Sequence, residues 1–164
     1  ATRRLSALRV LEEDLQTAVS GADIGEVERV LESAKYLRAE KWPLVAAVEQ
    51  RLRTLRQIRS ELDMASRSCS VEGLAFVIRS VRELGTAGSS WAEVRDAEAR
   101  LSMLHAVLRR LCAASSGGTL VEVEMAVGTA LQLGVSEGTE PPMGPALAAA
   151  VRRLLVLQMG GVSD

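Results

Sequence analysis

The sequence predicts an all-α protein made of tandem short three-helix units that are joined by shared long helices, an elongated helical repeat rod. Two observations predict it: apolar residues recur with the period of an α-helix, and the same rhythm returns along the chain. A third agrees with them, since no run alternates apolar and polar residues as a half-buried strand does. The 164 residues suffice for one ordinary domain or for a few small repeats.

The repeat begins with a tetrad, Arg-Leu-x-x-Leu, which occurs four times at spacings of 47, 49 and 53 residues. The tetrads start at Arg4, Arg51, Arg100 and Arg153. After each of the first three, apolar residues continue in steps of 3, 3, 4 and 3, which form one stripe along a helix. These stripes are Leu5, Leu8, Leu11, Leu15, Ala18; Leu52, Leu55, Ile58, Leu62, Ala65; and Leu101, Leu104, Val107, Leu111, Ala114.

A second stripe follows each of the three first stripes, in steps of 3, 4, 3 and 3. Its members are Ile24, Val27, Leu31, Ala34, Leu37; Val71, Leu74, Ile78, Val81, Leu84; and Leu120, Val123, Val127, Ala130, Leu133. Two stripes in three copies at matched offsets indicate an internal repeat of alternating long and short helices.

Local signals set the ends of these helices. Capping boxes are predicted at Asp23–Glu26, Ser90–Glu93 and Thr119–Glu122, because an acceptor side chain precedes a Glu by three residues. Further signals are Ser70 as an N-cap, Pro43 in a first turn, and Gly85, Gly134 and Gly117–Gly118 at helix ends. The predicted helices are 2–20, 23–39, 42–68, 70–85, 90–116, 119–134 and 142–159.

The long helices measure roughly 40 Å and the short ones roughly 24 Å at 1.5 Å per residue, so a short helix covers about half of a long one. One unit therefore combines the second half of a long helix, a short helix and the first half of the next long helix. The expected units are 1–52, 52–101 and 101–164, the last with a longer loop at 134–144.

Connection by a continuous helix resembles the topology of spectrin-type rods in miniature, without any spectrin sequence motif. The leucine and alanine spacing is also similar to the helical-hairpin repeats of large ciliary and cytoskeletal proteins of protists. The resemblance implies a structural role and a cytoskeletal or ciliary association. Both ends fall inside expected long helices, so we expect a segment of a longer array, unless Gly160–Gly161 mark a true terminus.

Composition argues against several classes of function. Twenty basic and 21 acidic residues leave a net charge of −1, which does not suit binding to nucleic acid. Aromatic residues make up 2% of the chain, too few for a base-stacking platform. No apolar run approaches the roughly 20 residues that span a bilayer, so membrane insertion is not expected. No signal peptide is visible either, and we therefore expect a cytoplasmic location.

Catalysis is not expected either. The only histidine, His105, stands seven residues before Cys112, which places them roughly 10 Å apart along a helix and too far for a dyad. We interpret Cys69 and Cys112 as small core or boundary thiols. The neighbouring carboxylates, such as Glu12–Glu13–Asp14 and Glu61–Asp63, are expected on the solvent side of the helices. We therefore expect no enzyme activity, no cofactor and no metal site.

Candidate partner-binding residues are the basic stretch Arg51, Arg53, Arg56 and Arg59, together with Trp42 and Trp91. The basic stretch resembles a calmodulin-type target helix, whose apolar face a packed array would already use. Each tryptophan starts an equivalent helix and either plugs a gap between helices or anchors a partner. The tetrad arginines either form a row of docking charges or lay their stems over the core and pair with a Glu.

These features predict a structural or scaffolding segment that spaces or docks other proteins or neighbouring repeats. The alternative is an adaptor that binds an amphipathic partner helix in a groove between units.

Overall fold

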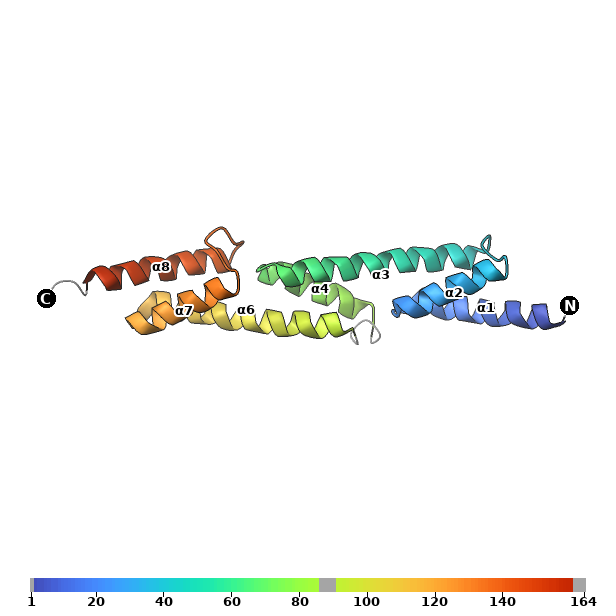
Figure 1. Cartoon of the computed structure of the whole chain (residues 1–164), viewed down its shortest axis with the longest axis horizontal. Helices are drawn as coiled ribbons and strands as arrows, with labels where there is room; N and C mark the ends of the chain where they lie inside the picture. Colours follow the sequence, from blue (N-terminus) through green and yellow to red (C-terminus); the bar gives the residue numbers. More distant parts are fainter. Residues whose placement is uncertain (1, 86–90, 161–164) are drawn as a thin grey trace. The chain divides into compact units, whose positions relative to one another are not determined.

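The structure is a computed structural model that describes residues 2–85 and 91–160 (Figure 1). Over these residues the chain forms seven α-helices and no strand, which confirms the all-α class. They are α1 Thr2–Ser20, α2 Ile24–Tyr36, α3 Pro43–Arg67, α4 Val71–Glu83, α6 Ala92–Gly117, α7 Leu120–Gln132 and α8 Met143–Gly160.

The short helices α2, α4 and α7 each have 13 residues and end two or three residues before the predicted ends. The cause is a left-handed residue just after each helix, Arg38 (φ 58°), Gly85 (φ 92°) or Gly134 (φ 84°). After α2 and α7 the chain then turns back, and the N–H groups of Ala39 and Val135 reach the carbonyls of residues five positions earlier. This arrangement closes a helix C-terminus. The last two or three residues of each predicted range therefore form the cap and are not a last helical turn.

The predicted N-terminal caps are present where the structure describes them. Asp23 accepts a hydrogen bond from the Glu26 N–H at 3.1 Å, and Ser70 Oγ accepts one from the Gly73 N–H at 3.1 Å. The Asp23 box is only half formed, because the Glu26 carboxylate pairs with Arg29 at 3.2 Å.

At α7 the box is complete, since Thr119 caps Glu122 and the Glu122 carboxylate accepts the Thr119 N–H at 2.8 Å. The predicted cap at Ser90 lies outside the described residues.

The chain divides into two compact units. Unit 1 comprises Ala1–Glu61 and Arg79–Val94, and unit 2 comprises Leu62–Ile78 and Arg95–Asp164. The first boundary falls inside α3, so this helix contributes to both units. The division into three repeat units stays a prediction.

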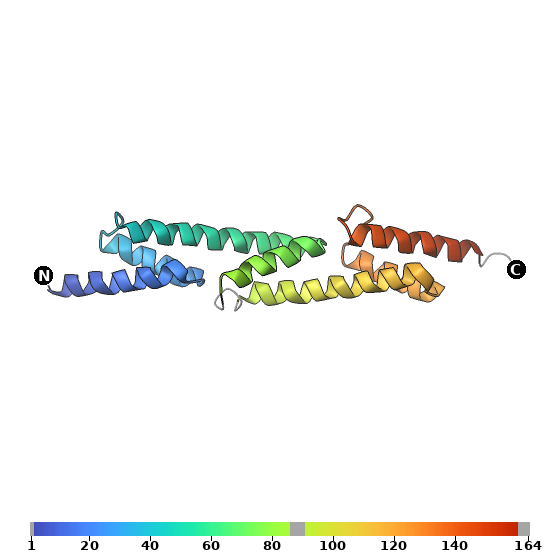
Figure 2. The same cartoon turned by 180° about the vertical axis from the view of Figure 1, so that it is seen from behind.

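Within unit 1, α2 lies between α1 and the first part of α3 (Figures 1 and 2). The apolar stripes of the three helices meet in one core. Its members are Leu11, Leu15, Ala18, Ala22, Val27, Val30, Leu31, Ala34, Ala39, Val45, Val48, Leu52 and Leu55. The packing explains why these helices form, since an amphipathic 13-residue helix such as α2 is marginal until its apolar face is covered.

Unit 2 is built around α6, α7 and α8, with α7 packed against α8. Its most buried large side chains come from predicted stripe positions and from the start of α8. They are Leu62, Leu74, Leu104, Leu111, Met143 and Leu147.

Candidate functional site

The six candidate residues all belong to unit 1, but the structure places them in four different settings. Arg51 lies half-buried at the end of α1, and Trp42 and Trp91 lie at the edge of the core. Arg56 and Arg59 form surface ion pairs, and Arg53 lines a groove. They do not form one continuous basic face.

Arg51 closes the C-terminus of α1. Its Nε donates to the Gly21 carbonyl at 2.8 Å, and its Nη2 donates to the Ser20 carbonyl at 3.3 Å. The last carbonyls of a helix lack partners inside the helix and carry the negative end of its dipole, so a cation is favoured there. Of the two interpretations of the tetrad arginines, pairing with a Glu is therefore wrong for Arg51, which donates to main-chain oxygens.

Arg100, the equivalent tetrad arginine in unit 2, also binds a helix end. Its Nη2 donates to the Leu133 carbonyl at 2.9 Å, at the C-terminus of α7. The Cys69 thiol donates to the same carbonyl at 3.4 Å, and lies 3.8 Å from that guanidinium nitrogen. In both units a tetrad arginine thus occupies a helix C-terminus. The sequence signal for this contact is that the recurring residue is always Arg and never Lys, because only a guanidinium offers several N–H groups in one plane.

The two tryptophans pack at the edge of the unit 1 core, and both are half-buried. Trp91 also donates from Nε1 to the Ala22 carbonyl at 3.2 Å, one residue beyond the carbonyls that Arg51 binds. The end of α1 is therefore held by side chains from two distant segments, at positions 51 and 91. This agrees with the interpretation of Trp91 as a residue that fills a gap between helices.

Arg56 and Arg59 project from α3 to carboxylates on other segments of unit 1. Arg56 pairs with Glu28 of α2 at 2.7 Å, and Arg59 pairs with Glu93 at the start of α6. The pKa of Glu93 lies below its ordinary value, first because the carboxylate accepts its own backbone N–H and second because of Arg59. Both pairs are exposed, and such pairs each contribute about 0–1 kcal/mol to stability.

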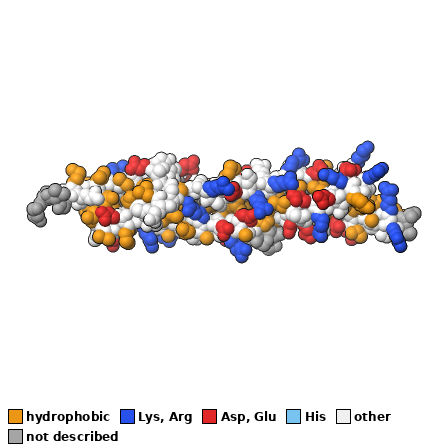
Figure 3. Space-filling view, viewed as in Figure 1, with side chains coloured by type: hydrophobic (Ala, Val, Ile, Leu, Met, Phe, Trp, Pro, Cys, Tyr) orange, Lys and Arg blue, Asp and Glu red, His pale blue; other side chains and the backbone are white. Residues whose placement is uncertain are grey.

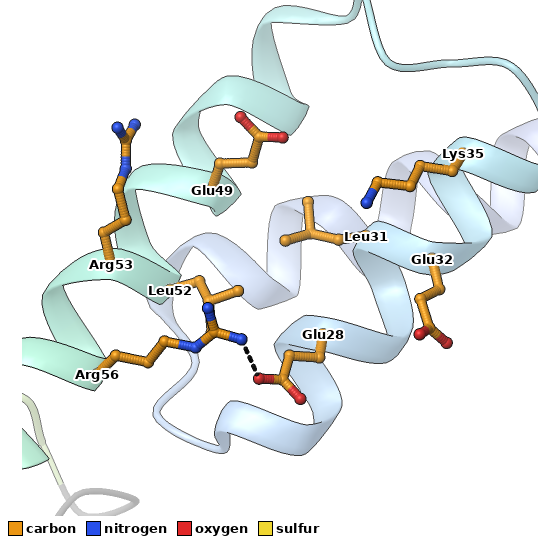
Figure 4. A pocket seen from close by; sticks show the side chains of 8 residues that line it. All are labelled: Glu28, Leu31, Glu32, Lys35, Glu49, Leu52, Arg53 and Arg56. Atoms are coloured by element: carbon orange, nitrogen blue, oxygen red, sulfur yellow. Dashed lines mark hydrogen bonds and ion pairs between the residues drawn. The ribbon is translucent and has the colours of Figure 1, made fainter.

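A groove of about 500 Å³ lies between α2 and α3 (Figure 4). Leu31 and Leu52 form its apolar part, and charged side chains of both signs surround them. The charged residues are Glu28, Glu32, Lys35, Glu49, Arg53 and Arg56. Three acidic and three basic groups around two leucines suit a polypeptide surface with apolar and charged side chains more than they suit a small anion.

The chemistry-bearing side chains of α6 do not meet at one place. His105 and Cys112 are both exposed, and Cys112 stands next to the buried Leu111 but off the apolar stripe. The expectation of a core or boundary thiol is thus wrong for Cys112. It holds for Cys69, which is half-buried at the entry to α4.

Within residues 2–85 and 91–160, no group of three or more His, Cys, Asp and Glu residues is arranged to hold a metal ion. None of the helices there is both long enough and apolar enough to cross a membrane. Comparisons with protein-family models, curated proteins and solved structures found no match.

Proposed function

We propose that this chain is a structural or scaffolding segment, a helical-repeat rod that spaces or docks protein partners and carries out no catalysis. The observation that supports it most is the apolar rhythm that returns in three copies at matched offsets. Repeats of this kind contact mainly their neighbours, so length grows with the number of copies. The partners in this proposal are other proteins or neighbouring repeats, in a cytoplasmic, cytoskeletal or ciliary setting.

The contacts at the end of α1 support a spacing role. A spacer transmits a fixed distance only if the junctions between its helices resist bending. In unit 1, Arg51 and Trp91 bind three successive carbonyls, those of Ser20, Gly21 and Ala22. Such contacts restrict the turn between α1 and α2 in direction as well as in distance.

The proposal is tested by adding one unit. A second copy of residues 52–100 placed directly after Arg100 keeps the register, because Leu52 and Leu101 are equivalent. Since a long helix of 25 or 26 residues is shared by two units in this proposal, one added unit should lengthen the chain by about half of such a helix, roughly 20 Å. Energy transfer between dyes at positions 3 and 158 measures the change, with both native cysteines replaced by Ser.

A control variant receives a Gly/Ser linker of the same length at the same point. This variant should report a broad distribution of distances instead of a discrete increment. An added unit that leaves the distance unchanged would contradict the rod.

The groove between α2 and α3 favours a second candidate function, an adaptor that holds an amphipathic partner helix. Its mixed charges provide the polar part of such a contact, and its floor is formed by two core leucines that are each 8% exposed. Arg53 is the informative residue, because it is exposed and lines the groove. If the groove binds a helix, Arg53→Glu should weaken binding of an acidic amphipathic peptide without a change in helicity.

A further inference from the structure

The first part of α1 carries an apolar strip with a basic rim. Leu5 is 61% exposed, and Arg3, Arg4 and Arg9 beside it are exposed as well. From Thr2 to Leu11 the helix has three arginines and no acidic residue. Figure 3 shows basic side chains over this end of the molecule.

The equivalent part of α3 carries the same residue types, and there they contact other helices of unit 1. A shift of 47 residues brings Leu5 onto Leu52 and Leu8 onto Leu55, which are 8% and 0% exposed. The same shift brings Arg4 onto Arg51 and Arg9 onto Arg56. The leucines are therefore buried on α3, whereas on α1 Leu5 is exposed and Leu8 is half-buried. The arginines at positions 51 and 56 have polar partners on other helices, and Arg4 and Arg9 are exposed.

The element that covers α3 is a helical hairpin, the end of α1 followed by α2. Its turn supplies the carbonyls of Ser20 and Gly21 to Arg51. The fifth residue of α2, Glu28, pairs with Arg56, and Leu31 shares a core with Leu52. The covering element thus has three features: open carbonyls at its turn, a Glu at the fifth position of its second helix, and a leucine three residues later.

We propose that the Arg4–Leu5–Leu8–Arg9 face of α1 docks a helical hairpin of a partner protein with these three features. Turn carbonyls of the partner would accept hydrogen bonds from Arg4, and its short helix would cover Leu5 and pair a Glu with Arg9. The net positive charge of the face favours a partner helix that carries this Glu. The proposal rests on the repeat equivalence in the proposed function and names the partner of one surface.

A second copy of this chain is a poorer occupant. The hairpin in unit 1 is already covered by α3. The α6–α7 hairpin of unit 2 also has a Glu at the fifth position of its short helix, Glu124, but α7 is packed against α8. Both hairpins are therefore covered on the face that they would need. The α3–α4 hairpin lacks the Glu, because the fifth residue of α4 is Ala75.

The probe is a labelled peptide with the sequence of residues 11–36, added to the full chain and followed by fluorescence anisotropy. We expect saturable binding that Leu5→Asp weakens at least about tenfold. Val10→Asp is the matched control: Val10 is also exposed, at 55%, but is equivalent to the polar Gln57 and lies off the docking face, so binding should change by less than about twofold.

A charge reversal tests the register. Arg9→Glu should weaken binding of the original peptide, and a peptide with Glu28→Arg should bind the Arg9→Glu chain better than it binds the original chain. Equal effects of Leu5→Asp and Val10→Asp, or no recovery after the reversal, would overturn the proposal.

A tethered form keeps the test decisive if the peptide does not fold by itself. A copy of residues 8–48 joined directly before Thr2 keeps the helix register, because position 2 is equivalent to position 49. Amides of residues 3–10 should then gain protection from hydrogen exchange, and Leu5→Asp should remove that protection. Unprotected amides in this tethered chain would overturn the proposal, whereas the unit-insertion experiment would be unaffected. Sedimentation of the unmodified chain as a dimer that Leu5→Asp dissociates would instead identify a second copy as the occupant and would also overturn it.

Discussion

At the residue scale, the recurring arginine meets main-chain carbonyls at helix ends. Arg51 does so at the end of α1 and Arg100 at the end of α7. The spacing of the tetrads predicted that these arginines are equivalent, but not what they bind, because a carbonyl is present at every residue and leaves no mark in the sequence. Carboxylates are visible in the sequence, so pairing with a Glu is one of the two interpretations that the sequence suggests.

Arg38 provides a prediction at this scale. It adopts φ 58° just after α2, at the position that Gly85 and Gly134 occupy after α4 and α7. A side chain with a Cβ is strained there, and glycine is not. Arg38→Gly should therefore raise the free energy of unfolding by about 0.5–1 kcal/mol, after the added flexibility of the unfolded chain is taken into account.

Urea unfolding followed by circular dichroism measures the change. Gly85→Ala is the matched control, since its Cβ would meet no neighbour within 4 Å and would report the backbone strain at φ 92° alone. This variant should lose a similar amount of stability. An Arg38→Gly chain that is less stable than the original would contradict the assignment of strain.

At the element scale, apolar periodicity and caps located all seven described helices, and most predicted starts fall within one residue of the observed ones. The ends of the short helices were less predictable, because the residue that ends α2 is an arginine and not a glycine. The candidate site was less predictable still. Arg51, Arg56, Arg59 and Trp91 bind within unit 1, and those contacts join residues 28 to 69 positions apart. A helical stripe shows which face is apolar, but it does not show which polar groups of another helix will lie opposite.

Two leucines from corresponding stripes, one on α3 and one on α1, give a prediction for the elements. Leu55 is fully buried on α3, whereas Leu5 is largely exposed on α1. Leu55→Asp places an unpaired carboxylate in the core, at a cost of several kcal/mol against a total stability of about 5–15 kcal/mol. We expect loss of the helical circular dichroism signal at 25 °C, and the same for Ile78→Asp.

Leu5→Asp is the control for this substitution, because the same change at an exposed position of the corresponding stripe should leave the spectrum intact. A Leu55→Asp chain that stays helical and melts cooperatively would show that this part of α3 is not a core element.

At the scale of the whole molecule, the central claim is that echoed units stack in one direction through shared helices. The sequence supports it through the matched offsets, and the structure divides the chain into two compact units that each include part of α3. Helix sharing has a physical consequence, since a helix that belongs to two units couples their folding. Because α3 contributes to both units, a substitution in its buried stripe should destabilise both together.

Small-angle X-ray scattering of the unmodified chain tests this claim most directly. A compact globule of this length has a radius of gyration of about 15 Å. Units stacked in one direction through long helices should give a value above about 20 Å and a pair-distance distribution with an extended tail. A radius of gyration near 15 Å with a symmetric distribution would contradict the stack, and with it the proposed role as a spacer.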